Sequence, residues 1–279
     1  MIPPVARDFV AGEEPATAFE HTRQTNEAGV GVILNKLGEH YHERGPAEED
    51  TAAYEQLIAE LGETDLDSCV SVKPSQLGID VSPAVFEENY RRVVEAGSEH
   101  GVFVWCDMED ATTTDTTLDA FESVATEFGG GVGLCVQANL RRTRADLERL
   151  VDLPGKIRLV KGAYDEDEEI AYTDQSAVDE AFREDLTYLF KNRDSGVAVG
   201  SHDPEMIAYA RELHERHGSD YEIQMLMGVR EEAQRRLARE GREVYQYAPY
   251  GSEWASYFYR RVRERKENLL FAARAVLGV

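Results

Sequence analysis

The sequence predicts an α/β protein built as a single (β/α)₈ barrel of the TIM type, and three observations support this prediction. Short apolar runs recur along the chain and end in polar residues, as buried parallel strands do. The segments between them have the length and composition of helices, which gives alternating βα units. The 279 residues suffice for eight such units in one domain covering residues 1–279. The eight runs occupy residues 30–40, 68–75, 101–110, 131–139, 156–164, 196–203, 221–228 and 243–251.

Helices are expected in the segments that separate the apolar runs. The first should extend from Glu14 to Ala28, with a proline in its first turn. An acidic helix is expected over residues 46–63, where apolar side chains recur at helical spacing. Residues 141–150 should form a charged surface helix, and a long acidic helix should cover roughly 166–193.

The charge balance is the most unusual feature of the composition. There are 54 Asp and Glu residues against 30 Lys and Arg residues, and the formal net charge is −24. The acids are spread over the predicted helices, and lysine is scarce. Such a surface is typical of proteins from a high-salt cytoplasm, where salt screens the self-repulsion. It argues against nucleic acid as a partner, because phosphate binding needs a basic patch.

The cysteines and the hydropathy pattern indicate a cellular compartment. Cys69, Cys106 and Cys135 each fall within a predicted strand and are odd in number, so buried free thiols in a reducing environment are expected. The sequence shows neither a signal peptide nor an apolar run long enough to cross a bilayer. We therefore expect a cytoplasmic protein, with peripheral contact to the inner face of a membrane left open.

The active site of a (β/α)₈ barrel lies at the carboxyl ends of its strands, so polar residues at these ends are candidates. Lys73 could bind an anion or form a Schiff base, or it could be a lysine that reaches solvent over apolar surface. His202 could be an acid–base or stacking group, or an ordinary core histidine. Glu39 could equally be an exposed loop acid. The full candidate ring is Glu39, Lys73, Asp107, Gln137, Lys161, Tyr164, His202 and Tyr247.

Two further groups at the strand ends have alternative interpretations. Asp107, Glu109 and Asp110 could form a Mg²⁺ site, or Asp110 could cap the helix that follows. Arg158 and Lys161 lie beside a backbone that Gly162 leaves open to close approach, which suits a phosphate or another anion.

The last predicted helix carries a distinctive pattern of charges. Tyr257, Arg260, Arg261 and Glu264 follow helical spacing and share one face. An arginine pair with a glutamate one turn later can clamp a carboxylate, since arginine binds carboxylates in a bidentate manner. The alternative is an exposed helix held by salt bridges.

Together these motifs resemble those of the proline dehydrogenase family, in particular its short monofunctional bacterial and archaeal members. The resemblance covers nearly the whole chain, and the segments "RLVKGAY" and "YFYRR" carry it most specifically. It implies a distorted barrel with the C-terminal helix over its mouth and with FAD bound non-covalently. It also implies oxidation of L-proline to Δ1-pyrroline-5-carboxylate, with electrons passing to a membrane quinone. The matching segments, in family order, are "LGE", "VKPSQLG", "CDMED", "VQANL", "RLVKGAY", "SHDP", "QMLMG", "YAPYG" and "YFYRR".

The resemblance also implies roles for individual residues. Lys73, Arg260 and Arg261 would hold the substrate carboxylate, with Glu264 orienting Arg261 and Glu39 closing as an ion-pair gate onto Arg260. The walls around the proline ring would be Tyr164, Leu226, Tyr247 and Tyr257, and Tyr247 favours proline over hydroxyproline. The flavin contacts would be Asp107, Gln137, Arg158, Val160, Lys161, Gly162 and His202.

The sequence departs from the family pattern at Asn35, Pro74, Asn139 and Asp165, which bears on the gate, the lysine and the flavin contacts.

Two other classes of function also fit the barrel. One is a Schiff-base lyase or aldolase that uses Lys73 or Lys161 as its nucleophile. The other is a non-catalytic binding protein, for which the complete set of arginine pair, lysine and tyrosines has no evident use.

The acidic surface predicts that salt stabilises the protein. We expect the melting temperature to rise from dilute buffer to molar NaCl, because salt screens the repulsion among 54 acidic side chains. Scanning calorimetry at several salt concentrations measures this dependence. A melting temperature that does not change with salt would contradict the prediction.

Overall fold

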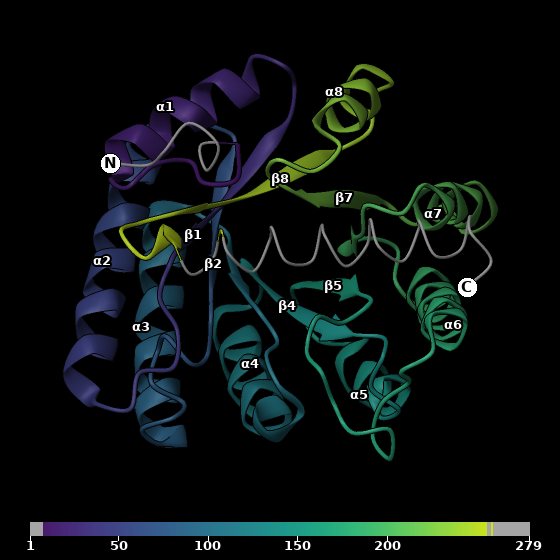
Figure 1. Cartoon of the computed structure of the whole chain (residues 1–279), viewed down its shortest axis with the longest axis horizontal. Helices are drawn as coiled ribbons and strands as arrows, with labels where there is room; N and C mark the ends of the chain where they lie inside the picture. Colours follow the sequence, from purple (N-terminus) through teal and green to yellow (C-terminus); the bar gives the residue numbers. More distant parts are fainter. Residues whose placement is uncertain (1–7, 256–257, 259–279) are drawn as a thin grey trace, which may run out of the picture.

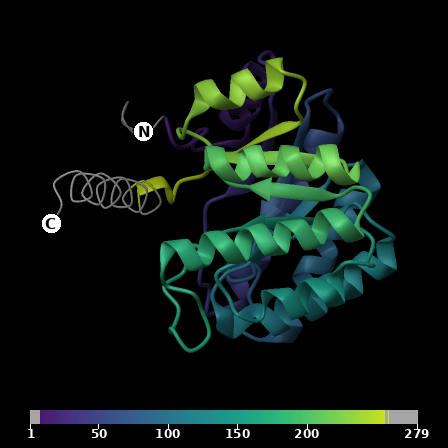
Figure 2. The same ribbon diagram turned by 90° about the vertical axis from the view of Figure 1, so that its right-hand side faces the viewer.

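The computed structural model describes residues 8–255 and residue 258, and in this part of the chain a closed barrel of eight parallel strands is surrounded by helices (Figures 1 and 2). The strands follow one another around the barrel in sequence order, and the first pairs with the last. The predicted (β/α)₈ barrel is confirmed. Each predicted run contains one strand; the strands are β1 (Gly31–Lys36), β2 (Ser68–Val72), β3 (Val104–Cys106), β4 (Val132–Gln137), β5 (Lys156–Val160), β6 (Val197–Gly200), β7 (Tyr221–Leu226) and β8 (Val244–Tyr250).

The helices run antiparallel to the strands and cover the outer face of the barrel (Figure 1). Several begin at a side-chain cap: Ser82 accepts a hydrogen bond from the Val85 amide, and Asp203 accepts one from the Glu205 amide. These caps satisfy amides that lack a partner within the helix. The helices are α1 (Pro15–Asn26), α2 (Arg44–Gly62), α3 (Pro83–His100), η2 (Ala111–Thr113), α4 (Thr114–Phe128), α5 (Thr143–Leu150), α6 (Gln175–Asn192), α7 (Pro204–His217) and α8 (Glu231–Arg239).

The long acidic helix expected over 166–193 begins later than predicted. Asp174 caps α6 by accepting hydrogen bonds from the Ser176 and Ala177 amides, so the helix starts at Gln175. The acidic segment before it forms a loop that pairs with the segment after β4, where the Tyr172 amide donates to the Asn139 carbonyl at 2.7 Å. Helix-forming composition is therefore overridden by backbone pairing between two loops at the same end of the barrel.

Apolar side chains form two separate layers. The larger lies between the sheet and the helices and contains the outward-facing strand residues, such as Val32 and Leu34 of β1. A smaller group fills the barrel itself, where Ile33, Trp105 and Ala198 are fully or almost fully buried. Cys69, Cys106 and Cys135 are buried free thiols, as predicted. Since successive strand residues alternate between these layers, each strand places every second side chain inside the barrel.

Arginine–carboxylate pairs connect consecutive outer helices from α2 to α7. Each of these five helix–helix contacts contains at least one such ion pair. An exposed pair contributes little individually, but the series crosslinks neighbouring helices along much of the barrel. Representative pairs are Arg92–Glu55 at 2.9 Å, Arg91–Glu127 at 3.0 Å, Arg149–Asp119 at 2.8 Å, Arg144–Asp185 at 3.0 Å and Arg183–Glu205 at 3.1 Å.

A chain of buried hydrogen bonds connects α1 to the carboxyl end of β7. The His21 imidazole Nε2 lies 2.6 Å from the Gln246 Oε1, and the Gln246 amide donates to Gln234 at 2.9 Å. The Gln234 amide in turn donates to the carbonyls of Leu226 and Val229, both at 3.0 Å. This series of hydrogen bonds fixes the backbone that follows β7 at the mouth of the barrel. Burial lowers the pKa of His21, against an opposing contribution from Gln246.

Within the described part of the chain, no helix is both long and apolar enough to cross a lipid bilayer.

The lowered pKa of His21 predicts a pH-dependent stability. Because the folded state disfavours the protonated imidazole, this contribution is complete above about pH 6.5, the unfolded pKa, and is lost as the pH falls below it. As the pH falls from 7.5 to 5.5, we expect the free energy of unfolding of His21→Gln to rise relative to that of the unmodified protein; Asp185, whose pKa burial raises to about 6, contributes in the opposite sense in both proteins and cancels from this difference. Urea unfolding at the two pH values, at constant salt, measures the effect.

His42 provides the matched control, because it is exposed. His42→Gln should retain the full pH dependence of the unmodified protein. If the two variants respond equally to pH, His21 is not the titrating group.

Candidate active site

The carboxyl ends of the strands bring together most of the predicted functional side chains. Strand register places Leu226 beside Tyr247 and Gln137 beside Val160. Leu226, Val160 and Tyr247 are partly exposed, whereas the strand residues below them are buried. The mouth of the barrel is therefore where these side chains can reach a ligand.

A buried ion pair between Arg158 and Asp107 lies beneath this mouth. Arg158 is 4% exposed, and its guanidinium pairs with the Asp107 carboxylate and donates to Gln224 at 2.9 Å. The guanidinium also lies 4.8 Å from the centroid of the Trp105 ring. Burial is the largest single influence and lowers the pKa of Arg158, but Asp107, Cys135 and Tyr247 together raise it by more, and the net shift is upward. Arg158 is thus held as a cation inside the barrel.

Asp107 organises the polar groups around it. Its carboxylate accepts hydrogen bonds from the Ser71 hydroxyl at 2.8 Å and the Tyr247 hydroxyl at 2.6 Å, besides that from Arg158. Burial, reinforced by the charge of Asp107, raises the pKa of Tyr247 well above its ordinary value. Tyr247 therefore remains a neutral donor, and its ring is fixed at the mouth.

Lys73 and Glu39 form an ion pair at the ends of β2 and β1. The Lys73 Nζ lies 2.7 Å from the Glu39 carboxylate, and the lysine side chain is only 13% exposed. Pro74 directly follows the lysine, and the Gln76 amide donates to the Lys73 carbonyl at 3.1 Å in the turn that results. The proline thus begins a turn and leaves the ammonium at the mouth.

Lys161 lies between two carboxylates at the end of β5. Its Nζ is 2.6 Å from Asp179 and 2.7 Å from Asp203. Burial lowers the pKa of Lys161, but the hydrogen bonds to both carboxylates outweigh it and raise the pKa. The predicted anion-binding cation is therefore already neutralised by two acids, one of which also caps α7.

Gly162 and Gln137 shape the same side of the mouth. Gly162 has φ +116°, and a Cβ there would lie 2.1 Å from the Asn139 side chain. The Gln137 amide donates to the Glu109 carbonyl at 2.7 Å. Only glycine fits at position 162, because its φ is positive and a Cβ would clash with Asn139. The missing side chain also leaves the backbone accessible to a ligand.

His202 supports the opposite wall. Its Nε2 accepts a hydrogen bond from the Leu226 amide at 3.2 Å, which places the proton of the neutral ring on Nδ1. The Arg230 guanidinium donates to the His202 carbonyl. His202 thus holds the end of β7, next to the side chains of Leu226 and Tyr247.

The acids after β3 have structural partners. Asp110 caps η2 by accepting from the Thr112 amide, and Glu109 accepts from the Ser75 amide and hydroxyl at 2.6 and 2.8 Å. Of the two interpretations of these acids, capping accounts for Asp110. Among the described residues no group of His, Cys, Asp or Glu has the arrangement of a metal site.

Several polar side chains that pair with the predicted residues were not predicted from the sequence. Four of the predicted residues lie outside the part of the chain that the structure describes. Ser71 and Gln224 are polar residues at inward positions of largely apolar strands, and strict alternation would have revealed them. Asp179 and Asp203, the partners of Lys161, come from α6 and the start of α7, and no local pattern links them to β5. The residues outside the described part are Tyr257, Arg260, Arg261 and Glu264.

The sequence matches the family model described as "Proline dehydrogenase" over residues 18–274. Proline dehydrogenase 2 of Bacillus subtilis is 34% identical over 270 residues, which cover 96% of this chain and 88% of the relative. The proline dehydrogenase of Deinococcus radiodurans is 33% identical over 280 residues, covering 98% of this chain and 90% of the relative. The similarity thus extends over nearly the full length of both chains.

Solved structures give the same result. Proline utilization A from Bdellovibrio bacteriovorus, inactivated by N-propargylglycine, superposes with a TM-score of 0.84 and 25% identity. The match covers 92% of this chain and 32% of that protein. Proline utilization A of Bradyrhizobium japonicum has the same fold, with a TM-score of 0.73 over 91% of this chain and 30% of that protein, at 19% identity. The chain belongs to the proline dehydrogenase family.

Proposed function

We propose that the protein oxidises L-proline to Δ1-pyrroline-5-carboxylate with FAD as its cofactor, and that a membrane quinone accepts the electrons through peripheral contact with the membrane. The observation that carries this proposal is the family match over residues 18–274, together with the convergence of Lys73, Leu226 and Tyr247 at the barrel mouth.

The residues at the mouth are compatible with a flavin. Gly162 leaves backbone accessible beside Asn139, and Gln137 contributes a neutral amide suited to the polar edge of a ring. Asp107, Arg158, Val160, Lys161 and His202 complete the proposed set. When bound, FAD would accept the hydride, which no side chain can do. The phosphate groups of FAD would have to compete with the carboxylates of Asp179 and Asp203 for the ammonium of Lys161.

Lys73 is proposed to bind the carboxylate of proline. In the structure Glu39 lies against this ammonium at 2.7 Å, so substrate would replace or share that contact. Arg260 and Arg261, with Glu264 beside them, are proposed to complete the carboxylate site from the C-terminal helix. Fixing the carboxylate holds the ring carbon next to nitrogen in one orientation, which is catalysis by positioning.

The proline ring is proposed to lie against Tyr164, Leu226, Tyr247 and Tyr257. The Tyr247 hydroxyl is engaged by Asp107 at 2.6 Å, so the ring presents its carbon edge rather than a free hydroxyl to the substrate. Such a wall suits an unsubstituted ring. A ring hydroxyl would be buried there without a partner, at a cost in binding.

A Schiff-base lyase is less consistent with the geometry than a dehydrogenase mechanism. A nucleophilic lysine needs a lowered pKa, whereas two carboxylates raise the pKa of Lys161. The Nζ of Lys73 is engaged by the Glu39 carboxylate at 2.7 Å, so it does not lie open to a carbonyl substrate in this arrangement.

The proposal predicts a visible spectrum that responds to proline. The purified protein, reconstituted with FAD in high salt, should be yellow, and anaerobic proline should bleach its flavin absorbance. Absorption spectra before and after addition measure both properties. A bound flavin that proline does not reduce would exclude proline as the substrate, and a protein that cannot bind FAD would exclude the cofactor.

Replacing the proposed carboxylate-binding lysine should weaken proline binding. We expect Lys73→Met to raise the KM for proline roughly 10- to 100-fold, which corresponds to the loss of one charge-assisted hydrogen bond. The flavin content should stay the same. Lys191→Met makes the same chemical change at an exposed position on α6 and should leave KM unaltered. Equal KM values in the two variants would refute the role of Lys73.

A further inference from the structure

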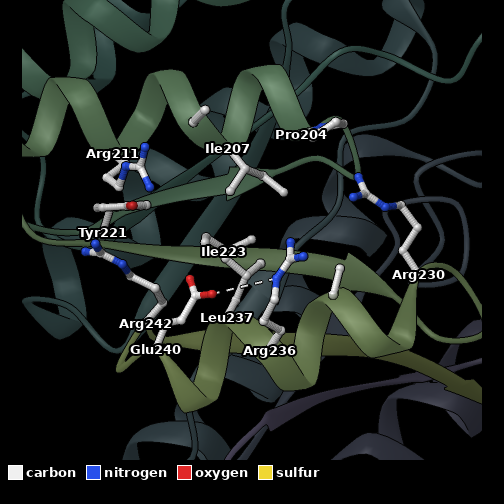
Figure 3. A pocket seen from close by; sticks show the side chains of 12 residues that line it. Pro204, Ile207, Arg211, Tyr221, Ile223, Arg230, Arg236, Leu237, Glu240 and Arg242 are labelled. Carbon is white, nitrogen blue, oxygen red and sulfur yellow. Dashed lines mark ion pairs between the residues drawn. The ribbon is translucent and has the colours of Figure 1, made fainter.

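The series of arginine–carboxylate pairs between neighbouring helices runs from α2 to α7 and, in the part of the chain that the structure describes, does not continue to α8. Every consecutive pair of helices from α2 to α7 has at least one such ion pair. Within the described residues, the contact between α7 and α8 has none. Both helices nevertheless direct arginines towards it, and no carboxylate of the opposite helix meets them (Figure 3).

A groove of about 300 Å³ separates the two helices over the outer face of β7. Its floor is apolar and includes Ile207, Ile223 and Leu237, while its walls carry arginines (Figure 3). Four arginines and a single carboxylate line it, in a chain whose net charge is −24. The lining arginines are Arg211, Arg230, Arg236 and Arg242, and the carboxylate is Glu240.

These guanidinium groups are poorly neutralised. Arg236 reaches Glu240 only at 3.7 Å, and Arg211 reaches Glu215 of its own helix at 3.9 Å, both too long for a hydrogen bond. Arg242 has no ion-pair partner among the described residues. The ion pairs between the other helices include contacts of 2.8 to 3.1 Å. The difference marks this contact as a site of uncompensated positive charge.

Two of the charges converge on one side chain at the end of the groove. Burial raises the pKa of Tyr221, and the positive charges of Arg242 and Arg211 oppose this shift. Figure 3 shows both guanidinium groups beside the Tyr221 ring, while Arg230 lies at the opposite end near Pro204. Positive charge is thus distributed along the groove and not gathered at one point.

We propose that this groove binds a small organic polyanion, a molecule with two or more carboxylate or phosphate groups, which bridges α7 and α8 as carboxylate side chains bridge the helices from α2 to α7. Guanidinium groups bind both kinds of oxyanion in a bidentate manner. The volume lies at the small end of ligand sites, and the apolar floor can accommodate a carbon skeleton between the charged groups. The site is on the outer surface of the barrel and does not depend on the proposed proline oxidation.

Citrate and fructose 1,6-bisphosphate are suitable probes, because both have a carbon skeleton and they separate the carboxylate and phosphate classes. Both should raise the melting temperature in a saturable manner at fixed ionic strength maintained with NaCl, since a ligand that binds only the folded state stabilises it. Isothermal titration calorimetry of the full-length chain should give the dissociation constants. The double variant Arg211→Gln/Arg236→Gln should weaken binding of the preferred probe by about tenfold or more.

The matched control is the double variant Arg235→Gln/Arg239→Gln. These arginines are on α8 but do not line the groove, and Arg235 pairs with Glu231 and Glu232 of its own helix. The control changes the net charge by the same amount and should bind the probes as the unmodified protein does. Equal affinities of the two double variants, or no saturable shift with either probe, would overturn the proposal.

A second variant tests the bridging directly. Ala208→Glu places a carboxylate within the groove, where it can pair with the arginines and compete with the anion. It should raise the melting temperature without added anion and weaken probe binding. Unchanged probe affinity in Ala208→Glu would contradict binding in the groove.

Discussion

The burial of Arg158 is the constraint on which the interior of this barrel depends. A guanidinium cannot lose its proton under ordinary conditions, so its charge must be compensated where it lies. Asp107 supplies the countercharge, Gln224 accepts from one nitrogen, and Trp105 covers the face of the group. Asp107 is therefore fixed by the fold, and Tyr247 is fixed by Asp107. The buried charge of Arg158 therefore fixes, through Asp107, how the Tyr247 ring is oriented at the mouth.

The same principle operates around the rim. In a chain with 54 acidic residues, the cations at the strand ends already have carboxylate partners: Lys73 has Glu39, and Lys161 has Asp179 and Asp203. An anionic ligand entering this mouth does not meet bare cations. It exchanges with carboxylates of the protein, so its net gain is the difference between two similar ion pairs. Selectivity can then rest on shape and on the number of simultaneous contacts more than on charge.

The sequence was sufficient for the fold because strand and helix periods differ and alternate regularly along the chain. The strand-end rule also located Lys73, Asp107, Gln137 and Tyr247 at one mouth. Their partners were harder to predict: Ser71 and Gln224 are polar residues buried within largely apolar strands, and Asp179 comes from a helix and not from a strand end. The acidic loop before α6 was predicted as helix, because composition does not reveal that its backbone pairs with the loop after β4. Local sequence patterns predict individual helices and strands, whereas contacts between segments distant in sequence are visible only in the three-dimensional structure.

The pairing of β1 with β8 has a consequence for the way the molecule is made. Ile33 lies opposite Tyr247, about 210 residues later in the chain, so the barrel cannot close until nearly all of it has been synthesised. Until then the edges of β1 and of the most recently formed strand both present unpaired backbone, which invites association between nascent chains. A strongly negative chain repels its own copies during this interval at short range, within the distance over which salt leaves its charge unscreened. The acidic composition can therefore protect the growing polypeptide as well as the finished one.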